Sequence, residues 1–251
     1  MMSELPACVM IFKGNGLPGW GANRTGRTWL GWCGLVLLGV LQVVAADPVV
    51  PAAVPERTGR EIYETCLLCH STREMQRGPI LDGLPDWYVA HQLRKFKKGI
   101  RGGVPENRAA ALMVPVMDTL KNDEEIQRVA DYIAELPPQP HLLVIRGDKK
   151  LGKTIYTRCI PCHGLSAEGN RAVKAPPLSL LEDWYLLDQL RKFQRGWRGT
   201  HAEDMEGRLM GLGVKVMPVK DLRDVVRYIA EDLPKVPPLQ PKQPPHPSPS
   251  Q

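Results

Sequence analysis

The sequence predicts an all-α protein built from two similar small domains in tandem, and two observations indicate this. Segments of the chain recur in the same order 93 to 97 residues further on, which is typical of a tandem duplication. Apolar residues in both copies repeat at helical offsets of three and four, and no alternating strand pattern of useful length occurs. We therefore expect helical domains at 55–138 and 150–234, joined by a linker at 139–149.

Three pairs of matching segments carry the duplication. They are GREIYETCLLCH from Gly59 with GKTIYTRCIPCH from Gly152, DWYVAHQLRKFKKGIRG from Asp86 with DWYLLDQLRKFQRGWRG from Asp183, and RVADYIAEL from Arg128 with RDVVRYIAEDL from Arg223. Spacing is kept as well as identity, and the main difference is four extra residues in SAEGNRAVK after His163. The two domains are therefore expected to share one fold.

Each copy predicts a basic amphipathic helix and a closing helix. The apolar stripes of the basic helices are Val89, Leu93, Phe96 and Ile100, and Leu186, Leu190, Phe193 and Trp197. The closing helices are marked by Ile126, Val129, Ala130 and Ile133, and by Leu222, Val225, Val226 and Ile229. Asn122, with Glu125 three residues later, predicts a capped start for the first closing helix.

Residues 1–46 differ from the rest of the chain. Arg24 and Arg27 precede the apolar run TWLGWCGLVLLGVLQVVA, and the small residues Ala45 and Ala46 close it. This pattern is typical of a signal peptide cleaved after Ala46, which predicts export to the periplasm. The run is nearly long enough to span a bilayer, so an uncleaved N-terminal anchor that associates the protein with a membrane is the alternative.

Two proline-rich segments connect and end the domains. The linker region LPPQPHLLVIRGDKK has a short apolar centre, which we expect to pack against a domain. The tail at 235–251, KVPPLQPKQPPHPSPSQ, has almost no apolar residues, so we expect it to be extended and disordered. The formal net charge is +6, with 33 basic and 27 acidic residues and no long basic run, which makes nucleic-acid binding a weak interpretation.

The two C-x-x-C-H motifs carry the chemistry. They contain every cysteine beyond the leader: Cys66 and Cys69 before His70, and Cys159 and Cys162 before His163. A four-cysteine zinc site is disfavoured because the pairs lie 93 residues apart, each at the same point of its own repeat. A thioredoxin-like disulfide is disfavoured because a predicted helix, from Gly59 to Cys66, precedes the motif. Two thiols one helical turn apart can each add to a vinyl group of one porphyrin, and the adjacent histidine can then bind its iron.

Both repeats resemble class I cytochrome c domains, and their tandem order is similar to that of the two-haem cytochrome c-four type. The shared features are an opening helix with a glycine and an aromatic residue, Pro79-x-Leu81 or Pro176-Pro177-Leu178, the DWY segment, a methionine-bearing loop, and a closing helix with Tyr132 or Tyr228. The resemblance covers about residues 55–235. It implies two covalently attached haem c groups, one wrapped by each domain. It also implies that the opening and closing helices cross at Gly59 and Gly152, and that a carbonyl near Pro79 or Pro176 orients the ligating histidine.

The resemblance also implies a methionine as the second iron ligand, and spacing selects Met113 and Met210. Trp87 precedes Met113 by 26 residues, and Trp184 precedes Met210 by 26 residues. The other methionines of the two repeats are Met75 and Met117, and Met205 and Met217. Core filling is the ordinary role of a methionine on an apolar segment. In the second repeat, Met217 and His201 remain alternatives to Met210.

We therefore interpret the protein as an exported electron carrier between redox donors and acceptors, without enzymatic activity of its own. Histidine and thioether ligands together fill both axial positions of the iron. The alternatives are a cytochrome subunit of a larger dehydrogenase or oxidase, and a two-haem peroxidase. The basic segments around Arg94 and Arg191 are either solvated helix faces or surfaces that steer the carrier to acidic partners.

Overall fold

The computed structural model describes residues 55–71 and 76–233, which all belong to one compact unit. The predicted signal peptide or anchor at 1–46, the tail at 235–251 and Met75 lie outside the described residues. The described chain is helical, and its only β-type pairing is an isolated bridge between Asn170 and Ala175. The all-α prediction is confirmed.

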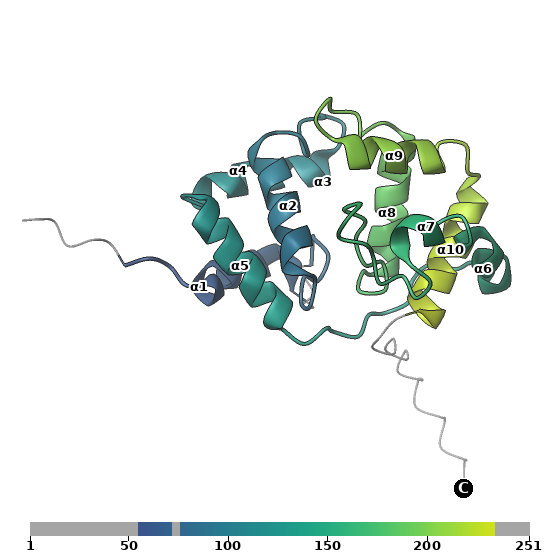
Figure 1. The fold of residues 1–251 in the computed structure, drawn as a ribbon, viewed down its shortest axis with the longest axis horizontal. Coiled ribbons are helices and arrows are strands. Elements are labelled where there is room, and N and C mark those ends of the chain that lie inside the picture. Colours follow the sequence, from purple (N-terminus) through teal and green to yellow (C-terminus); the bar gives the residue numbers. More distant parts are fainter. Residues whose placement is uncertain (1–54, 72–75, 234–251) are drawn as a thin grey trace, which may run out of the picture. The chain divides into compact units, whose positions relative to one another are not determined.

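The helices follow one another in the same order in both repeats (Figure 1). The first repeat contains α1 (Gly59–His70), α2 (Asp86–Lys97), α3 (Arg108–Ala111), α4 (Met113–Val116), the 3-10 turn η1 (Met117–Thr119) and α5 (Asp123–Glu135). The second contains α6 (Lys149–Tyr156), α7 (Ile160–His163), α8 (Asp183–Gln194), α9 (Met205–Val214) and α10 (Val219–Asp232). As predicted, the side chain of Asn122 caps α5 by accepting a hydrogen bond from the Glu125 amide (2.9 Å).

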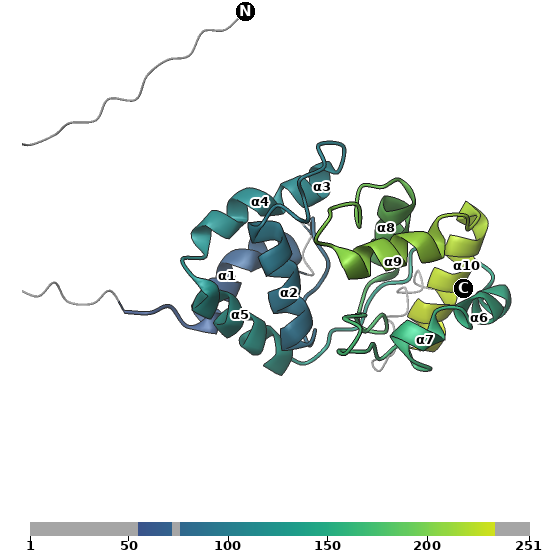
Figure 2. The ribbon, with the colours of Figure 1, turned by 45° about the horizontal axis from the view of Figure 1, so that its top comes forward.

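The opening and closing helices of each repeat pack closely together, α1 with α5 and α6 with α10 (Figures 1 and 2). A side chain at Gly59 would place its Cβ 2.2 Å from the carbonyl oxygen of Arg128, and one at Gly152 would lie 2.0 Å from that of Asp224. Only glycine allows these approaches, so the expected crossings are confirmed. Beside each crossing two tyrosine rings meet, with centroids 5.7 Å apart in both repeats.

The opening helix is continuous in the first repeat and broken in the second. The first C-x-x-C-H motif forms the last turns of α1, whereas the second begins after α6 has ended at Tyr156. Pro161 explains the break. Proline has no amide hydrogen for the carbonyl of Thr157 and its ring clashes there, but it is accepted in the first turn of the new helix α7.

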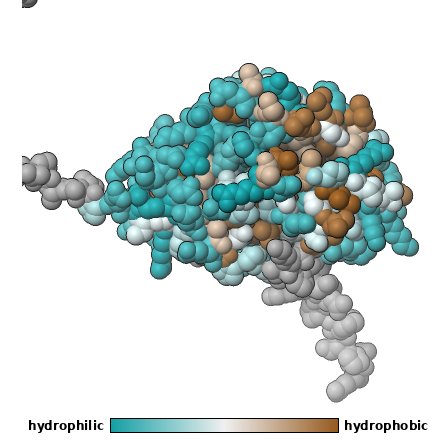
Figure 3. Space-filling view, viewed as in Figure 1, coloured by the Kyte–Doolittle hydropathy of each residue, from teal (hydrophilic) through white to brown (hydrophobic). Residues whose placement is uncertain are grey.

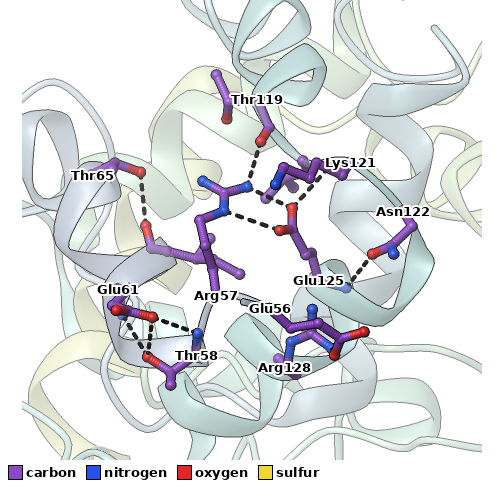
Figure 4. Close-up of polar contacts among 12 residues, drawn as sticks. Glu56, Arg57, Thr58, Glu61, Thr65, Thr119, Lys121, Asn122, Glu125 and Arg128 are labelled. Carbon is purple, nitrogen blue, oxygen red and sulfur yellow. Dashed lines mark hydrogen bonds and ion pairs between the residues drawn. The ribbon is translucent and has the colours of Figure 1, made fainter. Parts of the chain in front are cut away.

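Arg57 ties the start of α1 to the closing helix and to the segment before it (Figure 4). Its guanidinium binds both carboxylate oxygens of the buried Glu125 (3.0 and 2.5 Å) and donates to the carbonyl of Thr119 (2.6 Å). The Lys121 amide also donates to Glu125 (2.8 Å). Two parts of the first repeat that are distant in sequence, the chain just before α1 and the segment 119–125, are therefore held together at one carboxylate.

The linker packs on the second repeat, as its apolar centre predicted. The amides of Val144 and Ile145 donate to one oxygen of Asp183 (2.7 and 2.6 Å), whose carboxylate is fully buried at the start of α8. Ile145 also contacts the apolar core. Among the described residues no helix is both long and apolar enough to cross a membrane.

The segments expected to be methionine-bearing loops are largely helical, which corrects that expectation. Asn107 and Asp204 cap the first helix of each segment by accepting from the Ala110 and Gly207 amides (3.4 and 3.0 Å). In the first repeat Pro115 lacks the amide hydrogen that would continue the ladder, and the segment divides into α3, α4 and η1. The second repeat has no proline there, and α9 is continuous.

Candidate functional site

In the first repeat the predicted thiols and imidazole lie at the C-terminal end of α1. Cys66 is partly buried, Cys69 is exposed, and neither forms a disulfide. Burial raises the pKa of the Cys66 thiol. Their positions in one helix separate the two thiols by about one turn, as attachment to two vinyl groups of a single porphyrin requires.

The imidazole of His70 is fixed by the chain that follows it. Its Nδ1 lies 2.7 Å from the carbonyl oxygen of Pro79; because a carbonyl only accepts, Nδ1 carries the hydrogen and Nε2 keeps a free lone pair. Gly78 lies against the ring, since an added Cβ there would come within 2.3 Å of it. Burial lowers the pKa of His70, so the ring is neutral at pH 7 and able to bind a metal.

The second repeat reproduces this arrangement at α7. Nδ1 of the buried His163 lies 2.9 Å from the carbonyl oxygen of Pro176, and burial lowers the pKa of this imidazole. Cys159 is partly buried, which raises its thiol pKa to about 11, and Cys162 is exposed. The expectation that carbonyls near Pro79 and Pro176 orient the two histidines is confirmed.

The methionine segments can be matched residue by residue through their backbone contacts. An added Cβ at Gly102 would meet the carbonyl of Ala110 at 2.8 Å, and one at Gly199 would meet that of Gly207 at 2.2 Å. Leu120 donates its amide to the carbonyl of Met117 (3.2 Å), and Met217 donates to that of Val214 (3.1 Å). Equivalent residues are therefore 97 positions apart throughout these segments.

With this register, Met113 and Met210 are equivalent and the other methionines are not. The counterpart of the buried Met117 is the buried Val214, and the counterpart of Met217 is Leu120. Met113 and Met210 are both partly exposed. The exposed His201 lies in the turn before α9, where its Nδ1 accepts from the Glu203 amide (3.2 Å). The assignment of Met113 and Met210 as iron ligands stays a prediction.

Two arginines between the repeats are functional candidates that sequence reasoning missed. Arg101 is buried and donates to Tyr185 (2.8 Å), and Arg198 donates to Gln92 (3.2 Å) and Gln189 (2.8 Å). Each guanidinium stacks on a phenylalanine of its own repeat. Among the described residues no carboxylate hydrogen-bonds to either one, and Nε of Arg101 is buried without a partner.

These residues fit the haem that the motifs imply. The thiols are free, the imidazoles are neutral and oriented, and the charge of Arg101 contributes to the lowered pKa of His70, so this cation lies near the first site. The buried Arg101 and the half-buried Arg198, cations without carboxylate partners among the described residues, suit the anionic propionate groups of a porphyrin. Within the described ranges there is no group of three or more histidine, cysteine or acidic residues that could hold a bare metal ion.

The basic segments around Arg94 and Arg191 are much less available than their sequence suggested. Lys95 is buried in an ion pair with Asp204 and a second with Glu206 (2.7 Å), and Arg94 pairs with Asp123. The further buried cations of the two segments are Arg101 and Lys192, whereas Lys97, Lys98 and Arg195 are exposed. Lys95 and Lys192 are therefore not available to a partner, and docking through the cations of these segments that stay exposed remains a prediction.

Comparison with known proteins agrees with this description. The family profile for cytochrome c matches the chain twice, at residues 57–137 and 150–231. A cbb3-type cytochrome c oxidase subunit FixP from Bradyrhizobium sp. (strain ORS 278) is 28% identical over 191 residues, covering 70% of this chain and 63% of that protein. This chain therefore spans less than two-thirds of that relative's length.

Solved structures show the same tandem arrangement. Cytochrome c4 from Acidithiobacillus ferrooxidans is 25% identical with a TM-score of 0.54, covering 66% of this chain and 98% of that one. The thiosulfate dehydrogenase TsdBA from Marichromatium purpuratum is 26% identical with a TM-score of 0.56, covering 68% of this chain and 39% of that one.

Fold, motifs and matches together define a two-domain c-type haem protein. The chain belongs to the cytochrome c family. It carries two covalently attached haem c groups, one in each repeat.

Proposed function

We propose that this protein is an exported carrier that passes electrons, one at each haem, between redox proteins of the periplasm. Cys66 and Cys69 attach the first haem and Cys159 and Cys162 the second. The observation that supports this most directly is the paired geometry of the ligands. Both histidines are oriented by a backbone carbonyl, and a methionine recurs at an equivalent position in each repeat.

The residues of the chain hold and tune the haem groups in this proposal. When bound, the iron supplies a centre that gains and loses one electron. His70 and His163 would hold it through Nε2, and Met113 and Met210 would hold it through sulfur, which would raise its reduction potential. If these four side chains hold the two irons, no ligand position would remain for a substrate, which favours a carrier over a peroxidase.

We further propose that residues 1–46 direct export, with cleavage after Ala46, and that redox partners recognise basic parts of the surface. Lys97, Lys98 and Arg195 are the cations of the two basic segments that remain exposed. Their attraction for an acidic partner would be screened over about 10 Å at 0.1 M salt. If the leader is retained, it anchors the carrier to the membrane.

A second candidate function is that of a permanently bound subunit in a larger oxidoreductase. The matches to a cbb3-type oxidase subunit and to a thiosulfate dehydrogenase favour it. The two functions differ in what accompanies the protein: copurification with a catalytic subunit indicates a bound subunit, whereas recovery as a free protein indicates a mobile carrier.

Carbon monoxide tests the proposed ligation, because it binds ferrous haem only where an axial position is open. We expect the dithionite-reduced protein to keep its absorption spectrum under carbon monoxide, and a redox titration to show two one-electron steps. Stoichiometric carbon monoxide binding, or turnover of peroxide by the pure protein, would overturn the carrier function.

A further inference from the structure

The outer face of α9 carries an apolar stripe that no described residue covers. Met205, Leu209 and Leu212 of α9, together with Val216 in the turn just after its end, follow offsets of four, three and four, and their exposed fractions are 71%, 65%, 69% and 89%. In Figure 3 brown, hydrophobic atoms gather where Figure 1 places α9. The opposite face of the helix holds the buried Gly207 and Val214 and packs against α8. Packing of α9 on its own domain therefore does not need the exposed apolar stripe.

The first repeat shows that the fold does not require this stripe. With the register of 97 residues, the counterparts of Met205, Leu212 and Val216 are Arg108, Pro115 and Thr119, and only Leu209 has an equivalent large apolar residue, Leu112. A solvent-facing helix side is ordinarily polar, and a contiguous exposed apolar patch ordinarily marks an interaction site. The stripe is therefore a property of the second repeat alone.

Basic side chains lie along one border of the stripe. Arg208 donates to the carbonyl of Ala202 (2.7 Å), and Lys215 to that of Gln194 (3.4 Å). Arg195, next to Gln194 in sequence, stacks on Trp197. In the part of the chain that the structure describes, none of these three cations forms an ion pair with a carboxylate. An apolar surface bordered by unpaired cations complements a partner with an apolar centre and an acidic rim.

We propose that the outer face of α9, bordered by Arg195, Arg208 and Lys215, is the docking surface for an acidic redox protein, and that electrons enter or leave through the second repeat. This rests on the proposed function, in which Met210 binds iron. Met210 belongs to the same helix, and an α-helix with its side chains is about 10 Å across. A protein docked on the outer face is thus about one helix width from the sulfur ligand. This short distance would serve electron transfer to a redox protein, whereas a lipid surface accepts no electrons.

The test uses the full-length holoprotein and membranes of the source organism, whose redox proteins serve as candidate partners. Oxidation of the reduced protein by these membranes is compared with oxidation by ferricyanide, which needs no docking. For Leu212→Ser with Val216→Ser we expect the concentration at half-maximal rate to rise about tenfold, equivalent to about 1.4 kcal/mol. The maximal rate, the ferricyanide rate and both haem potentials should not change. The matched control in the first repeat, Leu112→Ser with Val116→Ser, should leave all of them unchanged.

Arg208→Glu with Lys215→Glu should also raise the half-maximal concentration and weaken its dependence on salt. An unchanged half-maximal concentration in both α9 variants would overturn the docking surface while the carrier function stands. So would stripe-dependent sedimentation with anionic vesicles, which indicates a lipid surface, or a stripe-dependent dimer in ultracentrifugation, which indicates a second copy. Wild-type protein that native membranes neither reduce nor oxidise would overturn both proposals.

Discussion

At the scale of single residues, each repeat fixes the orientation of its imidazole. The backbone contacts also show which methionine positions are equivalent between the two repeats. The Pro79 and Pro176 carbonyls set the hydrogen of each imidazole on Nδ1, which presents Nε2 for coordination. Among the methionines that the structure describes, only Met113 and Met210 are equivalent, since the counterparts of Met117 and Met217 are Val214 and Leu120.

The first prediction concerns these two methionines. Met113→Ala or Met210→Ala should lower the reduction potential of one haem and halve the sulfur-to-iron charge-transfer band of the ferric protein, because one thioether ligand is lost. Met217→Ala is the control and should leave the band intact. The ligand assignment in the second repeat fails if Met217→Ala halves the band while Met210→Ala does not.

At the scale of elements, the crossing helices depend on two glycines. Gly59→Ala and Gly152→Ala each place a methyl group against a backbone carbonyl that cannot move away, so we expect each to destabilise its own repeat by about 1–3 kcal/mol. Urea unfolding of the holoprotein measures this. Gly211→Ala in α9 is the control: its nearest new contact would be at 3.9 Å, so no loss of stability is expected. Equal effects at all three positions would contradict the close crossings.

The Arg57 contact should make the first repeat sensitive to acid. The hydrogen bonds from Arg57 hold the pKa of Glu125 at about 2, below its ordinary value of 4.5. This contribution to stability is therefore complete above pH 4.5 and is lost as the pH falls through about 2.

Arg57→Gln tests this. Its unfolding free energy at pH 7 should fall by about 2 kcal/mol, and the difference from wild type should vanish near pH 2. The exposed pair of Arg60 with Glu64 supplies the control, since Arg60→Gln should change stability by less than about 0.5 kcal/mol. A pH-independent loss in Arg57→Gln would show that the ion pair does not cause it.

The helices, the duplication and the motif residues could be predicted because each depends on local patterns. Periodicity found α2 and α5, and the Asn122 cap follows from side-chain chemistry. The burial of basic side chains in these segments could not be predicted. Whether Lys95 is exposed to solvent or paired with a carboxylate depends on Asp204, which lies 109 positions away in the sequence. The division of the first methionine segment depends on Pro115 acting in a segment whose helicity was not expected.

At the scale of the whole molecule, the two repeats meet through buried charges that differ between them. Lys95 reaches Asp204 and Glu206 of the other repeat, and although burial opposes it, this ammonium helps to hold the pKa of Glu206 at about 2. The equivalent Lys192 pairs instead with Asp188 of its own helix. The duplication has therefore diverged where its copies touch.

Asp204→Asn tests this contact with little change in shape, since asparagine already stands at the equivalent position, Asn107, and can still cap α9. Loss of one charge facing a buried ammonium should cost about 3 kcal/mol. It should also increase hydrogen exchange in α2 and α9. Lys192→Met is the control and should leave exchange at this contact unchanged. If Asp204→Asn exchanges as slowly as wild type, the ion pair does not hold the repeats together.

The central claim is that each repeat binds its own covalent haem through its own motif, and intact-mass spectrometry of exported protein tests it most directly. We expect the mass of the chain plus two haem groups, and plus one haem in Cys159→Ala with Cys162→Ala. The second repeat of that variant should become sensitive to protease, because a domain this small depends on the group that it wraps. Two haem groups retained in that variant, or one in the wild type, would contradict the account.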